Sequence, residues 1–180
     1  ASNVLFYAGE LRSGVFELAT IDGSGTINLE PIKNLYDADH PQFSTFGGYY
    51  GFIANINELI YRCNNTNVLS DNVKNGLLGM AYGYRAFSYF QMYRMYGGVV
   101  LRTEPDVILG NYEATLLYKG RSTAEETLNQ IKEDIKTSLE YFAQTDYVYK
   151  SSSKDYYWTK AATEMLAGEV YLWSGKVETG

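Results

Sequence analysis

Histidine, cysteine and proline are scarce in this sequence of 180 residues, which contains one His, one Cys and three Pro. A single cysteine, Cys63, cannot form a disulfide within the chain, and the only histidine, His40, would have to serve any Ser–His–Asp or Cys–His pair. His40 precedes Pro41 and has no serine nucleophile motif near it. We therefore expect no catalytic residues and no enzyme activity.

Basic clusters and long apolar runs are also missing. The 15 Lys and Arg against 21 Asp and Glu leave a net charge of −6, which argues against a protein that binds nucleic acid through its phosphates. No apolar run approaches the roughly 20 residues that cross a bilayer. The chain starts with Ala-Ser-Asn and not with the regions of a signal peptide, so we expect a trimmed or internal end.

The stretch 70–101 predicts a long helix with neighbours on two sides. Ser70 is a good N-cap, and Asp71 suits the positive end of the helix dipole. Gly97 and Gly98 end the helix, since glycine adopts the left-handed conformation without strain. A helix that is apolar on two faces belongs at the centre of a helical domain. Two faces follow helical spacing: Val73, Leu77, Met80, Ala81, Tyr84, Phe87, Ser88, Gln91 and Met95 on one, and Leu78, Tyr82, Tyr89, Phe90, Tyr93 and Tyr96 on the other.

Apolar spacing predicts a preceding helix at 49–62 and a following one that starts at 122. Ser122 and Glu125 have the spacing of a capping box. The acids of the second of these helices, including Glu133 and Asp134, are expected to face solvent. Its core stripe is Leu128, Ile131, Ile135, Leu139 and Phe142.

A last helix is predicted after the N-cap Thr159, and it ends near Gly175. Its apolar residues follow helical spacing and indicate one buried face. The side chains expected on that face are Ala162, Met165, Leu166, Val170 and Trp173.

Arg85 lies on the central helix between Tyr82 and Tyr89, where we expect it to be buried. A buried guanidinium needs a partner, because an unpaired buried charge is costly. We expect that partner to be Glu58 on the preceding helix or Glu164 on the last one.

Four segments of the chain together resemble a known family. The run A-x-x-x-R-A-x-x-Y-F-x-x-Y-R-x-Y-G-G-V-x-L at 81–101 resembles the signature helix of the SusD/RagB family, the glycan- and nutrient-binding lipoproteins of the outer membrane in Bacteroidetes-type bacteria. Y-G-F-I-A-N-I-N at 50–57, the capped helix at 121–139 and T-K-A-A with Y-L-W-S-G-K at 159–176 are similar to family segments in the same order. Family members are usually much longer than this chain.

The resemblance implies an all-α fold of tetratricopeptide-like helical hairpins with long irregular loops. It implies a single helical domain over 1–180, equivalent to the N-terminal half of a SusD-like protein, with the C-terminal half and the lipid anchor absent from this chain. The implied function is non-catalytic binding of an oligosaccharide or other nutrient at the outer-membrane surface. The implied partner is a SusC-like TonB-dependent transporter, and no cofactor is implied. A signal peptide and a lipid anchor, both outside this chain, would place the protein on the cell surface.

A second interpretation is a helical-repeat scaffold. In that case its tyrosine-rich surface docks the transporter or a peptide and the domain has no sugar site of its own. The 18 tyrosines suit either role, because tyrosine combines rigid contact area with a polar tip. A sugar site should gather aromatic faces around one concavity, whereas a scaffold should spread them over a broad patch.

A polar segment ahead of the 49–62 helix supplies the predicted ligand residues, which are Tyr36, Asp37, Asp39, His40 and Phe43. Sugar rings present apolar C–H faces and a rim of hydroxyls, so an aromatic platform with nearby acids suits them. The family resemblance also places ligand contacts in this segment. The alternative is that Tyr36 and Phe43 only pin the segment to the helices. Asp37, Asp39 and His40 match no metal-loop spacing, so we expect no metal.

A second aromatic cluster lies between the last two predicted helices. Trp158 precedes the predicted N-cap, where it could pack as a hydrophobic staple. The cluster consists of Tyr147, Tyr149, Tyr156, Tyr157 and Trp158.

Overall fold

The computed structural model describes residues 47–105, 118–149 and 157–175. The chain divides into two compact units, 1–50 and 51–180, and the description below concerns the second. The expectation of one domain over 1–180 therefore stays a prediction.

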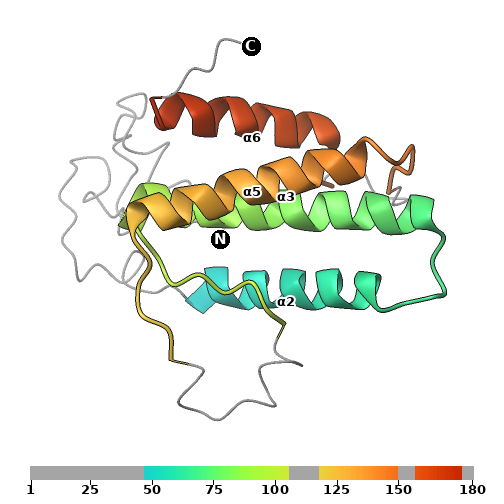
Figure 1. Ribbon diagram of the computed structural model, residues 1–180, viewed down its shortest axis with the longest axis horizontal. Coiled ribbons are helices and arrows are strands. Elements are labelled where there is room, and N and C mark those ends of the chain that lie inside the picture. The colour runs from blue at the N-terminus through green and yellow to red at the C-terminus, as the bar shows by residue number, and fades with distance from the viewer. Residues whose placement is uncertain (1–46, 106–117, 150–156, 176–180) are drawn as a thin grey trace, which may run out of the picture. The chain divides into compact units, whose positions relative to one another are not determined.

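The described residues form α-helices and no strands. The helices are α2 (Gly47–Asn64), α3 (Asp71–Tyr96), α5 (Ala124–Phe142) and α6 (Lys160–Trp173). Figure 1 shows α3 between α2 and α6, with α5 crossing in front of α3 and packed against it. This arrangement confirms the predicted all-α class and the central position of the 71–96 helix. No described helix is long and apolar enough to cross a membrane.

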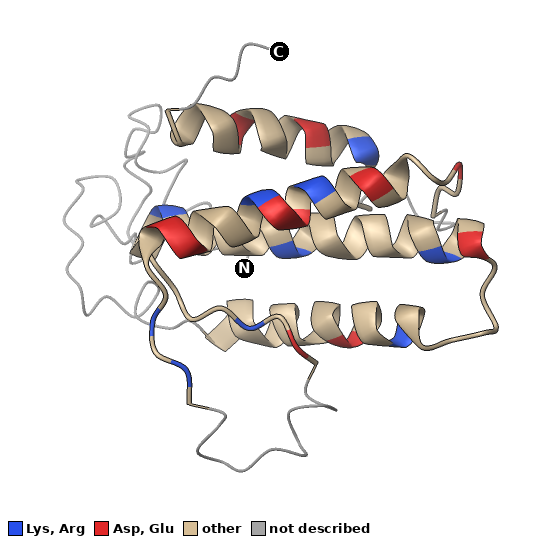
Figure 2. Cartoon of the chain, viewed as in Figure 1, with Lys and Arg blue, Asp and Glu red and all other residues tan. Residues whose placement is uncertain are grey.

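The centre of α3 is buried on two sides, but Leu78 and Ala81, which the spacing assigned to different faces, lie on the same side. On one side Leu78 and Ala81 pack with Ile56, Ile60 and Cys63 of α2. Figure 2 shows charged residues of both signs along α5, while α3 carries few. Cys63 is buried and is the small hydrophobe that the sequence predicted, and this burial raises the pKa of its thiol. Large apolar side chains are also buried on α3, α5 and α6. They are Tyr89, Phe90 and Met92 of α3, Ile131 and Ile135 of α5, and Leu166 and Val170 of α6.

Both ends of α3 follow the prediction. The hydroxyl of Ser70 accepts a hydrogen bond from the Val73 N–H at 3.4 Å. Gly97 has a φ of 72°, a left-handed conformation that favours glycine. Gly98 is required for a different reason, namely close approach of the backbone: a Cβ there would overlap the carbonyl oxygen of Ser122. The chain after α3 thus runs directly against the start of α5, where the Ser122 N–H donates to Val99 O at 2.9 Å.

The partner of Arg85 is Asp134 of α5, so the prediction of Glu58 or Glu164 was wrong. The Arg85 guanidinium donates from Nη2 and Nε to the two Asp134 carboxylate oxygens at 2.7 and 2.8 Å. Glu58 instead bonds Arg62 at 2.7 Å. Glu164 pairs with the neighbouring Lys160 at 3.7 Å.

Asp134 was expected to face solvent and is instead 1% exposed. It directly precedes Ile135, and the turn of α5 carries both onto the face packed on α3. Burial raises the pKa of Asp134, and the bonds from Arg85 and Gln130 oppose that rise. Burial lowers the pKa of Arg85, but the hydrogen bonds and charge of Asp134 outweigh burial, and its pKa is raised.

The same guanidinium extends the network to α2 and to the chain after α3. Arg85 Nη1 donates to Asn57 Oδ1 at 2.9 Å. Asn57 Nδ2 in turn donates to the carbonyl oxygens of Arg102 and Glu104 at 3.0 and 3.3 Å. The Tyr89 hydroxyl donates to Arg102 O and accepts from Arg102 N–H. One ion pair therefore joins α2, α3, α5 and the segment that leaves α3.

The capping box of α5 is one residue later than predicted. Thr123 Oγ1 accepts from the Glu126 N–H at 3.1 Å, and Glu126 Oε2 accepts from the Thr123 N–H at 2.7 Å. Ser122 and Glu125 do not form the box, because the Ser122 backbone is bonded to Val99. The predicted spacing was right and its register was wrong.

The buried face of α6 is narrower than predicted. Leu166 and Val170 are buried, as expected, and Thr163 joins them. Met165 and Trp173 are 78% and 54% exposed, so their predicted burial was wrong. Met165 lies off the stripe of α6 that faces α5 and α3. Trp173 lies at the exposed end of that stripe, where its ring meets that of Phe90 edge to face with centroids 6.1 Å apart.

Candidate functional site

The five predicted ligand residues lie outside the described part of the chain. Tyr36, Asp37, Asp39, His40 and Phe43 all fall within 1–46, so their role stays a prediction. Within the described ranges, no group of three or more His, Cys, Asp and Glu side chains could hold a metal ion.

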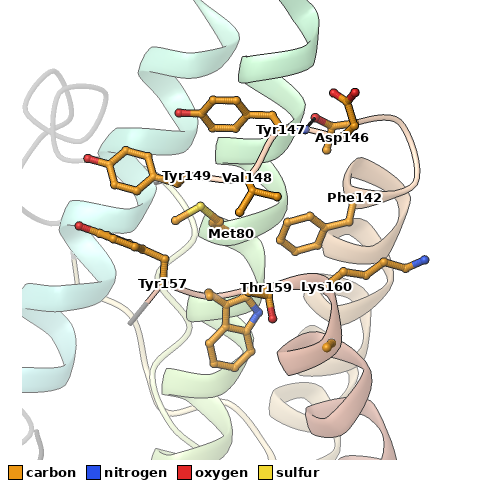
Figure 3. Close-up of a pocket in the computed structure, with 12 residues that line it drawn as sticks. Met80, Phe142, Asp146, Tyr147, Val148, Tyr149, Tyr157, Thr159 and Lys160 are labelled. Carbon is orange, nitrogen blue, oxygen red and sulfur yellow. Dashed lines mark hydrogen bonds between the residues drawn. The ribbon is translucent and has the colours of Figure 1, made fainter. Parts of the chain in front are cut away.

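The second aromatic cluster surrounds a pocket of about 290 Å³. The pocket lies beside α3, where the chain leaves α5 and enters α6, and Figure 3 shows the residues around it. Tyr147, Tyr149, Tyr157 and Trp158 of the predicted cluster all line it, whereas Tyr156 lies outside the described residues. The other lining residues are Met80, Phe142, Thr145, Asp146, Val148, Thr159, Lys160 and Ala161.

Three glycines of α3 bring these aromatic rings against the helix. Gly76, Gly79 and Gly83 are spaced by three and four residues, which places them on one helix face. A Cβ at Gly76 would meet the ring of Tyr147 at 2.5 Å, and one at Gly79 would meet the ring of Phe142 at 3.0 Å. A Cβ at Gly83 would overlap the indole nitrogen of Trp158. The missing side chains leave room for rings from three separate segments.

The glycine row is the signal that sequence reasoning missed. Glycine inside a helix costs about 1 kcal/mol relative to alanine. Repeated glycines on one face of a long helix therefore indicate a close approach by another part of the chain. The sequence does not say which aromatic residues make that approach.

The chain after α5 is held by the first turn of α3. Asn72 Nδ2 donates to Asp146 Oδ1 at 2.7 Å, and the Thr145 hydroxyl donates to Asn72 O at 2.6 Å. The Tyr147 N–H donates to Thr145 Oγ1 at 3.0 Å. These bonds fix the backbone that carries Tyr147 and Val148 over the pocket.

Trp158 forms a fixed wall of the pocket. Its indole N–H donates to Thr163 Oγ1 at 2.7 Å, and its backbone N–H donates to the Tyr84 hydroxyl at 3.1 Å. Its ring lies 5.2 Å from that of Tyr84 and 5.4 Å from that of Phe87, between centroids. Trp158 and Thr163 occupy the two positions of a hydrophobic staple, but they meet through a hydrogen bond.

Three tyrosines present their hydroxyls at the same side of the pocket. Figure 3 shows the hydroxyls of Tyr147, Tyr149 and Tyr157 pointing away from Met80 and Phe142. The rings of Tyr149 and Tyr157 meet edge to face with centroids 4.4 Å apart. Within the described ranges, none of the three hydroxyls has a hydrogen-bond partner. They are therefore available to a ligand.

The described lining combines apolar and aromatic side chains with two charged ones, Asp146 and Lys160. Asp146 is the one carboxylate among the described lining residues, whereas a glycosidase uses two that face each other. Histidine and cysteine are absent from that lining, so neither a Ser–His nor a Cys–His pair occurs among the described lining residues. The arrangement can hold a small ligand by apolar contact and hydrogen bonds.

Residues 19–172 match a family model, SusD-like, described as starch-binding and associating with the outer membrane. The chain belongs to this SusD-like family. Its resemblance to the family in the 81–101 run and three further segments is thereby confirmed.

Similar proteins agree with this assignment. A SusD-like protein, P38, of Formosa agariphila is 27% identical over 176 residues, which cover 96% of this chain and 31% of that protein. A solved SusD superfamily protein from Bacteroides fragilis is 42% identical to this chain, with a TM-score of 0.77. The match covers 99% of this chain and 35% of the B. fragilis chain. NanU of B. fragilis is 38% identical with a TM-score of 0.79, and the match covers 99% of this chain and 34% of NanU.

These neighbours confirm the tetratricopeptide-like helical fold that the sequence predicted. The SusD-like chain described here spans about a third of the length of the relatives that it matches.

Proposed function

We infer that this SusD-like protein binds an oligosaccharide, or another nutrient, without chemical change and delivers it to a SusC-like TonB-dependent transporter. The observation that carries the proposal is the family match over residues 19–172, whose description names starch binding and the outer membrane. The proposal includes, outside this chain, a signal peptide that directs export and a lipid anchor that holds the protein at the outer face of the membrane.

The segment 36–43 is the proposed main ligand site. Tyr36 and Phe43 would offer ring faces to the C–H face of a sugar, and Asp37 and Asp39 would accept hydrogen bonds from its hydroxyls. His40 would donate or accept according to its tautomer. The support is this mixture of side chains and the position of the segment ahead of α2, where the family makes ligand contacts.

The test is a glycan array with the full-length protein, followed by calorimetry with each glycan that binds. The variant replaces Tyr36, His40 and Phe43 with alanine. Tyr118→Ala is the control, because the Tyr118 side chain is 85% exposed and lies away from both aromatic clusters in sequence. Loss of binding in the triple variant alone supports the site. Absence of any glycan binding by the unaltered protein would refute an oligosaccharide ligand and favour the scaffold or a peptide-type nutrient.

The scaffold alternative is favoured by one observation, the apolar outer face of α6. Met165 and Leu172 are 78% and 71% exposed, and Gly168 between them has open space around it. The proposed occupant is the transporter. The variant Met165→Ser with Leu172→Ser should then weaken co-purification with the transporter and leave glycan binding unchanged. If the variant and the unaltered protein co-purify with the transporter to the same extent, this face of α6 is excluded as the docking surface.

A further inference from the structure

We propose that the pocket beside α3 is a second saccharide site, separate from the 36–43 segment, which takes one end of a neutral oligosaccharide. The inference rests on the proposed function in one respect, namely that the ligand class is carbohydrate. Its own basis is the arrangement of Tyr147, Tyr149, Tyr157 and Trp158 around one concavity. Gathering in one concavity is what distinguishes a sugar site from a broad docking patch.

The size of the pocket selects a small portion of a glycan. A volume of about 290 Å³ is near the lower limit of small-molecule sites, which span about 300–1,000 Å³. The space therefore suits the end of an oligosaccharide, with the remainder of the chain outside.

The surfaces of the pocket match the two kinds of surface on a sugar. The apolar floor of Met80 and Phe142 and the ring of Trp158 suit the C–H faces of a pyranose. The hydroxyls of Tyr147 and Tyr149, together with that of Tyr157, can each donate and accept, as sugar hydroxyls do. A purely apolar ligand would cover these hydroxyls without bonding them, which is unfavourable.

The charges of the pocket select a neutral ligand. Its charged lining residues within the described ranges are Asp146 and Lys160, one of each sign. Asp146 already accepts from Asn72, and Lys160 pairs with Glu164 at 3.7 Å. Neither a phosphate nor a strongly charged peptide has a cluster of opposite charge to meet here.

The pocket walls are largely preformed, which lowers the entropic cost of binding. Trp158 is held by two hydrogen bonds, and the segment that carries Tyr147 is bonded to the first turn of α3. The glycine face of α3 sets how deep the rings of Phe142, Tyr147 and Trp158 can lie.

The first test is calorimetry with the full-length protein and each glycan found on the array, malto-oligosaccharides included. The double variant Tyr149→Ala with Tyr157→Ala removes the two rings that meet edge to face and spares the hydrogen bonds of Trp158. We expect at least a tenfold loss of affinity for one neutral glycan. The control Tyr118→Ala should leave that affinity unchanged. An unchanged affinity in the double variant, with glycan binding intact, would overturn the second site and leave the proposed function standing.

A second measurement asks whether the pocket is open in the full-length protein. The variant Tyr149→Cys should react with a maleimide, and the bound glycan should slow that reaction. The native thiol Cys63 is buried at 2% exposure, so labelling beyond that of the unaltered protein reports the new thiol. Failure to label would mean that another part of the protein covers the pocket, and it would overturn the proposal.

The two tests separate the two proposals. If the unaltered protein binds no glycan, the carbohydrate ligand of the proposed function is refuted, whatever the pocket variants do. If the unaltered protein binds glycans and only the 36–43 variant binds them more weakly, the function holds and the second site is refuted.

Discussion

Arg85 of α3 and Asp134 of α5 are joined by two parallel hydrogen bonds in the interior of the domain. Their side chains are 6% and 2% exposed. The planar guanidinium matches both carboxylate oxygens, a geometry that lysine cannot reproduce. This pair, with Asn57, connects three helices to the segment that leaves α3.

Replacement of Arg85 by methionine should destabilise the domain strongly. Removal of one partner of a buried pair leaves an uncompensated charge and costs about 3–5 kcal/mol. Urea unfolding of Arg85→Met measures the loss. The matched control is Arg62→Met, since the pair of Arg62 with Glu58 is exposed and contributes about 0–1 kcal/mol. An unchanged free energy of unfolding in Arg85→Met would contradict the structural role of the pair.

A double replacement tests the same pair in another way. Arg85→Met together with Asp134→Leu removes both charges, and the pair of apolar side chains should recover much of the lost stability. A double variant that is less stable than Arg85→Met alone would show that the remaining network, through Asn57, matters more than the ion pair.

Replacement of Gly83 by alanine should disturb the pocket. The added Cβ would overlap the indole nitrogen of Trp158, and overpacking of this kind costs about 1–3 kcal/mol. Gly168→Ala is the control, because that helical glycine has nothing within 4 Å and alanine should stabilise α6 by up to about 1 kcal/mol. Thermal unfolding measures the stability of both variants, and the near-ultraviolet circular dichroism of the indole reports the packing of Trp158. Equal gains in stability at the two sites would refute the close approach of Trp158.

Gly98 should tolerate alanine poorly. A Cβ at Gly98 would overlap the carbonyl oxygen of Ser122, and backbone atoms cannot rotate away as a side chain can. We expect a loss of about 1–3 kcal/mol in urea unfolding. Gly120→Ala, at a position with open space around it, should unfold like the unaltered protein. A Gly98→Ala protein of full stability would mean that the chain after α3 can move off α5.

The stability of α5 should depend on pH through Glu126. Hydrogen bonds from the backbone and side chain of Thr123 lower the pKa of Glu126 below its ordinary 4.5. Its folded form thus favours the charged carboxylate. The contribution of Glu126 to the free energy of unfolding is present above the ordinary glutamate pKa. It is lost as the pH falls through the lowered pKa of Glu126 in the folded protein.

Melting temperatures from pH 7 down to pH 3 measure this dependence. The Glu126→Ala protein should be less stable than the unaltered protein at pH 7, and the difference should shrink in acid. Glu125→Ala is the control, because Glu125 lies in the same first turn outside the capping box. Thr123→Ala should cost about 1 kcal/mol. A difference that persists unchanged at pH 3 would exclude the charged cap.

The candidate site was only partly open to prediction from the sequence. The aromatic residues at 147–158 were recognised as a cluster, but the pocket that they surround depends on Gly76, Gly79 and Gly83, which are distant in sequence. The role of the 36–43 segment is still the prediction that the sequence made.

The capping box shows how closely two local patterns can compete. Ser122 with Glu125 and Thr123 with Glu126 have equal spacing. The Ser122 N–H is bonded to Val99, on the chain that Gly98 allows against α5, and the helix therefore starts one residue later.

By itself the sequence determined the helices, the caps at Ser70 and Thr159, the end of α3 at Gly97 and the family. These features depend on contacts within a few residues along the chain. The tertiary structure alone decided that Asp134 is the partner of Arg85 and that Trp158 lies on Gly83. Both depend on the rotation and crossing of helices from separate segments, where a shift of one residue along a helix turns a side chain by about 100°. Spacing along one helix does not specify which neighbour it will meet.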